Sequence, residues 1–228
     1  MSTIADNIAE VEARIRAAAL AVQRDVTSIH LLAVSKTKPA AALREAYAAG
    51  LRDFGENYLQ EARAKQVELA DLPLCWHFIG PIQSNKTREI AEHFAWVHSV
   101  DRLKIAQRLS EQRPAELPPL NICIQVNVSG EASKSGCTPH DLPALAAAIS
   151  ALPRLKLRGL MAIPEPTEDR AAQDAAFATV RQLQESLNMG LDTLSMGMSH
   201  DLESAIAQGA TWVRIGTALF GARDYGQA

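Results

Sequence analysis

Short apolar runs alternate with segments of helical periodicity along the whole chain. The runs consist mostly of aliphatic and aromatic residues, which is typical of strands buried on both faces. We expect eight strands, at residues 29–34, 53–55, 74–80, 96–100, 120–128 and 155–163, in a short segment before Leu194, and at 211–216. The spacing of apolar residues predicts helices at 39–49, 58–70, 139–151, 168–188 and 201–208, two more that end near 93 and 112, and an amphipathic helix at 3–24.

This alternation predicts the fold class. Each connection is long enough for a right-handed crossover between parallel strands, and eight such units favour a closed (β/α)8 barrel with an extra N-terminal helix. The alternative is an open doubly wound sheet, but no Gly-x-Gly-x-x-Gly turn follows the first strand. Because no linker of different composition divides the 228 residues, we expect one domain over residues 1–228.

Polar residues gather where the predicted strands end. In a (β/α)8 barrel the carboxyl ends of all strands meet at one rim, and active sites are built there. A stability requirement alone does not predict such a bias. The residues that come just after strands include Lys36, Glu56, Asn57, Gln83, Asn85, Ser129, Ser199, Gly216 and Thr217.

Lys36 comes directly after the first predicted strand, and Pro39 then opens a helix. A lysine at the end of a core strand is partly removed from water, which favours its neutral amine. The neutral amine is the nucleophile of Schiff-base chemistry, so Lys36 is a candidate nucleophile. The alternative is a lysine whose aliphatic part packs at the strand end while its ammonium group reaches solvent.

The last two strands end in turns suited to an anion. Glycine and two serines precede a helix in the stretch from Ser195 to Asp201, and Gly216 and Thr217 follow the eighth strand. Backbone N–H groups at such turns bind phosphate, and the loops after strands seven and eight are a frequent phosphate site in barrels. The alternative is that these are ordinary turns that cap helices.

Three further residues have two interpretations each. Arg214 lies within the eighth strand, where it could pair with Glu56 or Asp201, or donate to a ring nitrogen of a bound ligand. His77, in the third strand, could be a hydrogen-bonded barrel residue or an acid–base group. Lys134 could be a solvated loop charge, or it could receive a cofactor during transfer.

Composition excludes several classes of function. The net charge of −3 comes without a basic run, so we expect no nucleic-acid partner. Cys75, Cys123 and Cys137 are odd in number and widely spaced, which argues against disulfides and zinc, and we predict no metal. The sequence has neither a signal peptide nor a run of 18 apolar residues, so we expect a cytoplasmic protein without a membrane contact. We also expect a monomer.

Five motifs follow one another along the chain. They are Ala33-Val34-Ser35-Lys36, Phe54-Gly55-Glu56-Asn57, Trp76-His77-Phe78-Ile79-Gly80 with Gln83 and Asn85-Lys86, Ser195-Met196-Gly197-Met198-Ser199 with Asp201, and Arg214-Ile215-Gly216-Thr217 with Phe220-Gly221. In this order they resemble those of the barrel domain of alanine-racemase-like pyridoxal 5′-phosphate proteins. More closely, the chain is similar to the pyridoxal phosphate homeostasis family, also called proline synthetase co-transcribed homologues, and the likeness covers nearly the whole chain.

The resemblance implies a cofactor and its contacts. It implies that pyridoxal 5′-phosphate forms an internal aldimine with Lys36. It also implies that Ser199 and the backbone of Gly216 and Thr217 hold the phosphate, that Arg214 lies near the pyridine nitrogen, and that Asn57 lies at the edge of the cofactor.

The resemblance also bears on activity. Racemases and decarboxylases with this barrel have a second, β-rich domain that supplies an acid–base group, and we expect no room for one before Ala228. An arginine beside the pyridine nitrogen disfavours its protonation and weakens the cofactor as an electron sink. We therefore expect a protein of intracellular pyridoxal 5′-phosphate homeostasis that stores, delivers or buffers the cofactor, with apo-enzymes as recipients, and that has no catalytic residues and no strong activity of its own. The alternatives are a weak amino-acid racemase or another cofactor-dependent enzyme, and a cofactor-free Schiff-base aldolase.

Overall fold

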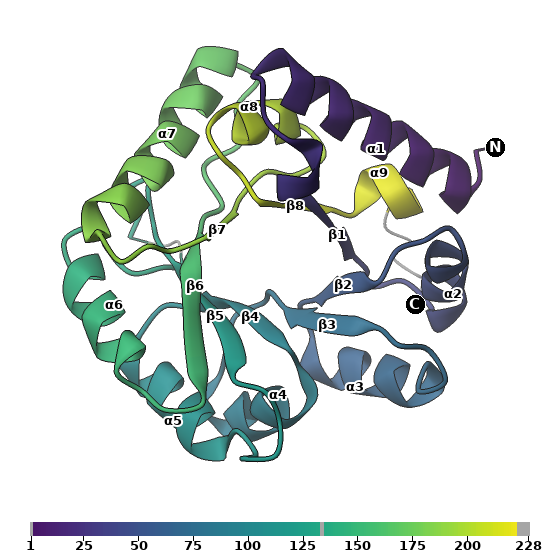
Figure 1. Cartoon of the computed structure of the whole chain (residues 1–228). Helices are drawn as coiled ribbons and strands as arrows, with labels where there is room; N and C mark the ends of the chain where they lie inside the picture. Colours follow the sequence, from purple (N-terminus) through teal and green to yellow (C-terminus); the bar gives the residue numbers. More distant parts are fainter. Residues whose placement is uncertain (1, 133–134, 223–228) are drawn as a thin grey trace.

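The computed structural model describes residues 2–132 and 135–222, and its strands form one closed parallel barrel (Figure 1). Each strand pairs with the next along the chain, and β8 pairs with β1 in the register that places Leu32 beside Arg214. The predicted barrel is confirmed, and the alternative of an open sheet is wrong. The strands are β1 His30–Val34, β2 Asp53–Glu56, β3 Cys75–Phe78, β4 Trp96–Val100, β5 Leu120–Gln125, β6 Leu155–Met161, β7 Thr193–Ser195 and β8 Trp212–Ile215.

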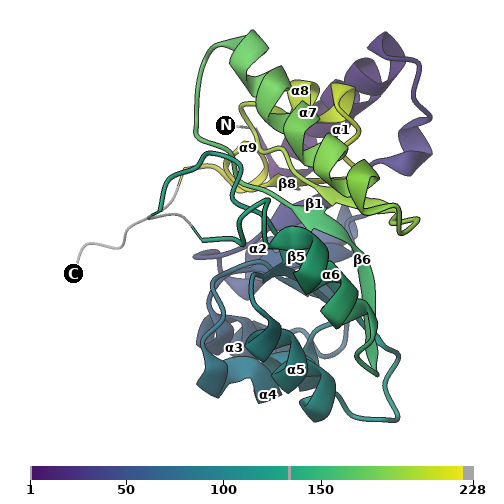
Figure 2. The same ribbon diagram turned by 90° about the vertical axis from the view of Figure 1, so that its left-hand side faces the viewer.

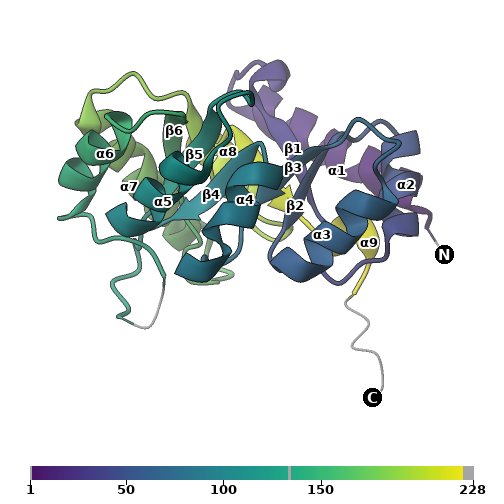
Figure 3. The ribbon, with the colours of Figure 1, turned by 90° about the horizontal axis from the view of Figure 1, so that it is seen from below.

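Helices surround the barrel on all sides. Those described are α1 Ile4–Ala21, α2 Ala40–Ala48, α3 Leu59–Glu68, α4 Thr87–His93, α5 Leu103–Gln112, α6 Leu142–Ser150, α7 Arg170–Leu187, α8 Leu202–Ala207 and α9 Thr217–Phe220, with short 3₁₀ turns at Val26–Ser28 and Ser84–Lys86. In Figure 2, α1, α7 and α8 lie on the opposite side of the strands from α3, α4 and α5. Seen from below, α3 and α4 cover the strands near them (Figure 3).

The N-terminal helix α1 completes the helical ring. The helix after β8, α9, has only four residues, and α1 packs against α8, α9 and α2 beside it (Figure 1). A capping box starts α1, because Thr3 accepts from the Asp6 N–H and the Asp6 carboxylate accepts from the Thr3 N–H. This confirms the predicted amphipathic helix, which covers the core from outside. Its buried residues are Ile8, Val11, Ile15, Ala18 and Ala19.

The predicted fifth strand is too long. We predict strand from 120 to 128, but β5 ends at Gln125 and only Val126 continues, as an isolated bridge to Cys137. The Asn127 side chain accepts from the backbone N–H and the hydroxyl of Ser129, which folds the chain into a turn at this point. An apolar pattern cannot show this local hydrogen bonding.

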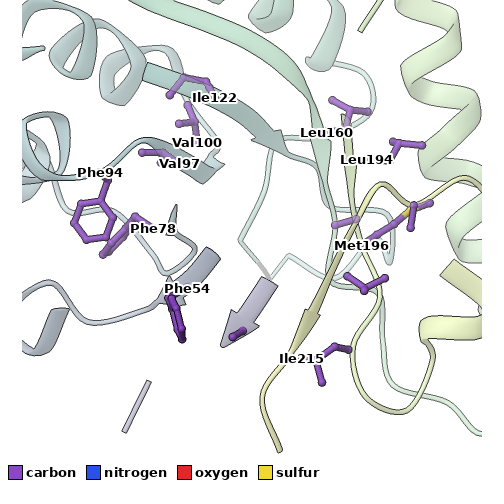
Figure 4. Packing of buried hydrophobic residues seen from close by; sticks show 14 of the residues in the cluster. Phe54, Phe78, Phe94, Val97, Val100, Ile122, Leu160, Leu194, Met196 and Ile215 are labelled. Atoms are coloured by element: carbon purple, nitrogen blue, oxygen red, sulfur yellow. The ribbon is translucent and has the colours of Figure 1, made fainter. Parts of the chain in front are cut away.

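Two distinct layers of buried residues result. The larger layer, which we call the outer shell, lies between strands and helices and is apolar; Phe54, Phe78, Ile122, Leu160 and Ile215 belong to it (Figure 4). The smaller layer, the barrel interior, contains a second apolar cluster with Leu32, Ile79, Trp96, Cys123, Met161 and Trp212.

The barrel interior also contains buried polar groups. His98 on β4 contacts Ser195 on β7, with 2.7 Å between Nδ1 and Oγ. Because β4 and β7 are not neighbouring strands, this contact crosses the inside of the barrel. Within the described residues, no helix is long and apolar enough to span a bilayer.

Candidate functional site

A cavity of about 270 Å³ opens where several strands end. It is lined by residues that lie in or after β1, β2, β3, β6, β7 and β8, as expected for the carboxyl rim of a barrel. The structure brings all six residues of the sequence-predicted site together here, although they come from four separate parts of the chain. These residues are Lys36, Asn57, Ser199, Arg214, Gly216 and Thr217.

Lys36 lies at the cavity wall because β1 ends in a tight turn. The backbone N–H of Ser35 still pairs with the Gly55 carbonyl at 3.0 Å, while the Lys38 N–H turns back to the Ser35 carbonyl at 3.1 Å. Thr37 takes a positive φ of 65° in that turn, which few residues other than glycine adopt. Lys36 is half-buried, as its place at the end of a core strand predicts.

A buried ion pair supports this turn from below. Lys65 Nζ donates to Glu56 Oε1 at 2.7 Å and to the Ser35 carbonyl at 2.7 Å, and the Ser35 hydroxyl donates to the same Glu56 oxygen at 2.8 Å. Burial raises the pKa of Glu56, and the Lys65 ammonium opposes that shift. The residue next to Lys36 is therefore held by side chains of β2 and α3.

Asn57 follows β2 and presents an unsatisfied acceptor. Its Oδ1 is buried and has no hydrogen-bond partner among the described residues. Gly80 fixes the backbone there, because a Cβ at position 80 would lie 2.3 Å from the Asn57 carbonyl oxygen. A buried amide oxygen without a partner is rare in folded proteins and indicates a place for a ligand or water.

The loop after β7 is fixed by two side chains, those of Asp201 and Arg14, and by the backbone conformation of Gly197. The backbone N–H of Met198 donates to Asp201 Oδ1 at 2.6 Å, and Gly197 has a φ of 98° that suits glycine. Arg14 of α1 donates to the Ser199 carbonyl at 2.9 Å and, through Nε and Nη2, to both carboxylate oxygens of Glu203. An arginine far away in sequence thus shapes the predicted phosphate loop.

The turn after β8 brings a helix start to the cavity. Gly216 is the N-cap residue of α9, and its carbonyl accepts from the N–H groups of Leu219 and Phe220. The first N–H groups of a helix have no partner inside that helix. The backbone N–H groups at Gly216 and Thr217 are therefore suited to bind a phosphate.

Arg214 reaches the cavity from the barrel interior. Its Nη1 donates to Ser195 Oγ at 2.8 Å and its Nη2 to the Ala162 carbonyl at 2.9 Å. The sequence-based ion pairs are wrong, because Glu56 binds Lys65, and Asp201 contacts the Met198 N–H. Burial lowers the pKa of Arg214 to about 10, so the guanidinium stays charged at neutral pH.

Comparison with known proteins identifies the family. The family model "Alanine racemase, N-terminal domain" matches residues 4–224. The chain is 80% identical over 226 residues to the pyridoxal phosphate homeostasis protein of Pseudomonas aeruginosa, with 99% of this chain and 98% of that protein covered. The Escherichia coli protein of the same name is 56% identical over 234 residues, with 99% of both chains covered. The chain belongs to the pyridoxal phosphate homeostasis protein family.

Solved structures agree with this membership. PipY of Synechococcus elongatus, in a structure with PLP bound, is 44% identical, has a TM-score of 0.84, and the match covers 96% of this chain and 100% of that chain. Alanine racemase of Corynebacterium glutamicum is 17% identical with a TM-score of 0.69, and the match covers 98% of this chain and 64% of that one. The second likeness shows the shared barrel fold alone.

His77 is a buried, hydrogen-bonded barrel residue. Its Nε2 lies 2.9 Å from Asp53 Oδ1 and 3.6 Å from Cys75 Sγ, so the three side chains form a cluster of possible metal ligands at the start of β2 and β3. Burial and the Asp53 carboxylate raise the pKa of the Cys75 thiol to about 12. The absence of a metal stays a prediction. Lys134 lies outside the described residues.

Sequence reasoning missed the residues that support the site. Arg14, Lys65 and His98 do not line the cavity: Arg14 contacts Ser199 at its wall, and Lys65 and His98 contact Ser35 and Ser195 behind it. For His98 the sequence offered one signal, a histidine within a strand whose other residues are mostly apolar. The partners of Arg14 and Lys65 follow from tertiary packing and have no signal in the local pattern.

Proposed function

We propose that this chain binds pyridoxal 5′-phosphate through Lys36 and serves in its homeostasis. One observation carries the proposal: an amine, a guanidinium and two phosphate-type turns line a single cavity. These are the groups that an aldehyde, a pyridine nitrogen and a phosphate monoester require. PLP-bound PipY and the curated relatives named for pyridoxal phosphate homeostasis support the same ligand.

The residues present fit this cofactor. Asn57 Oδ1 is a buried acceptor that a donor on a ligand would satisfy, and the backbone N–H groups at the start of α9 could bind a phosphate. Arg214 can only donate hydrogen bonds, so it suits an unprotonated ring nitrogen. The cavity thus offers a donor or an acceptor for each polar part of the cofactor.

Each residue then has a role in holding the cofactor. Lys36 is the tether: its amine would condense with the aldehyde and release one water, and hydrolysis would return both partners. Ser199, Gly216 and Thr217 would bind the phosphate, and Arg214 would fix the ring. Bound cofactor supplies an electrophilic aldehyde, and a positive charge beside the ring nitrogen makes the ring a weaker electron sink. Such a site suits storage and delivery, with apo-enzymes as the recipients that we propose.

Visible absorbance during cofactor titration tests this function. We expect wild type to develop the visible band of an amine-linked cofactor at a stoichiometry of about one, and Lys36→Ala to lose it. Lys38→Ala is the matched control, because Lys38 also lines the cavity while its Nζ donates to the Ala222 carbonyl at 2.8 Å. A band that persists in Lys36→Ala, or is lost in Lys38→Ala instead, would refute the tether.

A catalytic alternative is separable by isotope exchange. We expect no solvent deuterium to enter the Cα position of amino acids above the level that free cofactor gives. Exchange that depends on Lys36 would assign an enzymatic activity and overturn a purely carrier role. The monomeric state and the cytoplasmic location stay predictions.

A further inference from the structure

A chain of hydrogen bonds runs through the barrel interior from the cavity to the opposite end. Arg214 Nη1 lies 2.8 Å from Ser195 Oγ, which lies 2.7 Å from His98 Nδ1. His98 Nε2 lies 2.9 Å from His77 Nδ1, and His77 Nε2 lies 2.9 Å from Asp53 Oδ1. We call these five residues the relay. Its members come from β8, β7, β4, β3 and β2, so it spans the barrel.

The chemistry at its two ends gives the relay one direction. A guanidinium only donates, so Ser195 Oγ must accept from Arg214; an ionised carboxylate only accepts, so His77 must carry its proton on Nε2. His77 Nδ1 is then an acceptor, which requires a proton on His98 Nε2. His98 Nδ1 in turn accepts from the Ser195 hydroxyl. Every member is satisfied with both imidazoles neutral.

The surroundings keep the two imidazoles neutral and fixed. Burial lowers the pKa of His77, and burial together with His77 and Arg214 lowers the pKa of His98 well below its ordinary value. The His77 ring stacks on Trp96 at 5.5 Å with an interplanar angle of 10°, and Trp212 meets it edge-on at 4.8 Å. The rings have little freedom to leave this arrangement.

The two ends of the relay differ in their access to water. Asp53 is the first residue of β2, at the amino end of the strands, and 31% of its side chain is exposed. Arg214 is buried and lines the cavity at the other end. Within the described residues no carboxylate forms an ion pair with Arg214, so the relay is its hydrogen-bonded link to a negative charge. Burial lowers the pKa of Arg214; the Asp201 carboxylate acts on the guanidinium through space and raises that pKa, whereas the relay gives Arg214 a hydrogen-bonded path to a carboxylate.

We propose that Asp53 is a positioning residue for the cofactor cavity, acting on Arg214 through His77, His98 and Ser195. The Asp53 carboxylate selects one tautomer at each histidine. The Ser195 hydroxyl then donates to His98 Nδ1, and both lone pairs of its oxygen stay available to Arg214. The guanidinium is thereby held in one orientation before any ligand arrives. This inference deepens the proposed function, because the ligand that Arg214 faces there is the pyridine ring of the cofactor.

Nitrogen NMR of the histidine rings in the ligand-free protein tests the relay without any cofactor. We expect His77 and His98 each to carry a single proton, on Nε2, at neutral pH. In Asp53→Asn the amide can donate as well as accept, so we expect a second tautomer at both rings, and faster exchange of the Arg214 Nη protons. His98 and Arg214 do not touch Asp53, so a merely structural contact would leave them unchanged.

The matched control removes a carboxylate beside the same strand ends but outside the relay. Asp192 precedes β7 and accepts from Arg158 at 2.9 and 3.0 Å. Asp192→Asn should leave the tautomers of His77 and His98 and the Arg214 exchange unchanged. Unchanged signals in Asp53→Asn, or equal changes in both variants, would overturn the inference.

Cofactor affinity gives the second readout. Loss of one oriented hydrogen bond corresponds to about a two- to tenfold weaker affinity, which we expect for Asp53→Asn and for Ser195→Ala. Ser110→Ala is the control for a buried hydroxyl, because Ser110 donates to the Pro153 carbonyl and lines neither the relay nor the cavity. Affinities of Asp53→Asn and Ser195→Ala within twofold of wild type would refute the positioning role.

The two proposals fail in distinguishable ways. If wild type does not bind the cofactor, the proposed function fails, and the ring-nitrogen signals still decide whether Asp53 controls Arg214. If wild type binds and the signals of Asp53→Asn match those of wild type, only the relay fails.

Discussion

The outer shell and the barrel interior are both buried, but they are built differently. In the outer shell aliphatic and aromatic side chains from strands and helices pack against one another, and the Glu56–Lys65 pair between β2 and α3 is a buried polar exception (Figure 4). In the barrel interior two histidines, a serine and an arginine lie among two tryptophans and a few aliphatic residues. A protein selected for stability alone has no need of the second arrangement, because buried polar groups add little stability over apolar ones.

The difference shows that stability and ligand binding depend on different layers of the barrel. The outer shell closes the barrel and provides most of the hydrophobic stabilisation, since nearly all the large, fully buried side chains belong to it. The barrel interior orients a few groups towards the cavity. Substitutions in the two layers should therefore have different signatures, stability in one and cofactor binding in the other.

The largest effect on stability should come from the outer shell. Phe177 on α7 is 1% exposed and belongs to that layer. Phe177→Ala should lower the free energy of unfolding by about 3–5 kcal/mol, through lost burial and the cavity left behind. Urea denaturation measures this loss. Cofactor affinity should stay within twofold of wild type where the variant is folded, and a large loss of affinity would contradict the division between layers.

The buried ion pair under Lys36 should affect both properties. Lys65→Met leaves the Glu56 carboxylate, whose side chain is fully buried, without its ion-pair partner and also removes the 2.6 Å contact of Lys65 to the partly exposed Glu61. We expect a loss of about 3 kcal/mol in the free energy of unfolding, at the low end of the usual range because Glu56 can take up a proton. The Ser35 carbonyl also loses one of its two donors and keeps the Lys38 N–H, so cofactor affinity should fall as well.

A double variant sharpens this test. Adding Glu56→Gln to Lys65→Met removes the unpaired charge and should restore part of the stability, but not the contact to Ser35. Calorimetry and cofactor titration of the single and double variants separate the two contributions. Recovery of both properties together would contradict a specific role of Lys65 at the turn.

The pH dependence of stability should report on the barrel interior. Burial lowers the pKa of His77 and His98, so the folded state binds fewer protons than the unfolded state once the pH falls below about 6.5. Stability is then full above that pH and is lost as the pH falls towards the folded-state values. The loss should reach at most about 1.4 kcal/mol per pH unit for each histidine.

The titratable and charged groups that act on these two rings are Asp53, Cys75, His30 and Arg214. Denaturation curves between pH 7 and 5.5 measure the slope above the range of most carboxylates. His98→Gln should reduce the slope, and His93, whose pKa is also lowered, contributes to the part that remains. A slope unchanged by this substitution would show that other groups cause the acid sensitivity.

The smallest effect on stability should come from Arg14. Its ion pair with Glu203 is about one-third exposed on both sides, so Arg14→Gln should cost about 1 kcal/mol or less. The variant also removes the donor to the Ser199 carbonyl, and cofactor should bind several-fold more weakly. Inorganic phosphate as a competitor identifies the affected part of the cavity, and an unchanged phosphate affinity would contradict a role for Arg14 there.

Much of this organisation could be predicted from the sequence. Lys36, Asn57, Ser199 and the Gly216-Thr217 turn each follow a strand, and a closed parallel barrel brings all strand ends to one rim. The pattern of apolar residues therefore predicted the rim, but Gln83, Asn85 and Ser129 also follow predicted strands and do not line the cavity, so the choice among the rim residues depended on the resemblance.

The supporting contacts could not be predicted in the same way. His98 and Ser195 lie 97 residues apart and meet only across the barrel, and Arg14 and Ser199 meet because α1 closes the helical ring. Such pairs depend on strand register and helix placement, which no local motif encodes. For Arg214, the sequence correctly indicated a need for acceptors but named the wrong ones.

The central claim is that one amine, that of Lys36, tethers the cofactor. Borohydride reduction of the loaded protein, followed by peptide mapping with fragmentation, tests it most directly. The account predicts the reduced cofactor on Lys36 and none on Lys38, which shares the cavity. Reduced cofactor on another lysine, or on none, would contradict it.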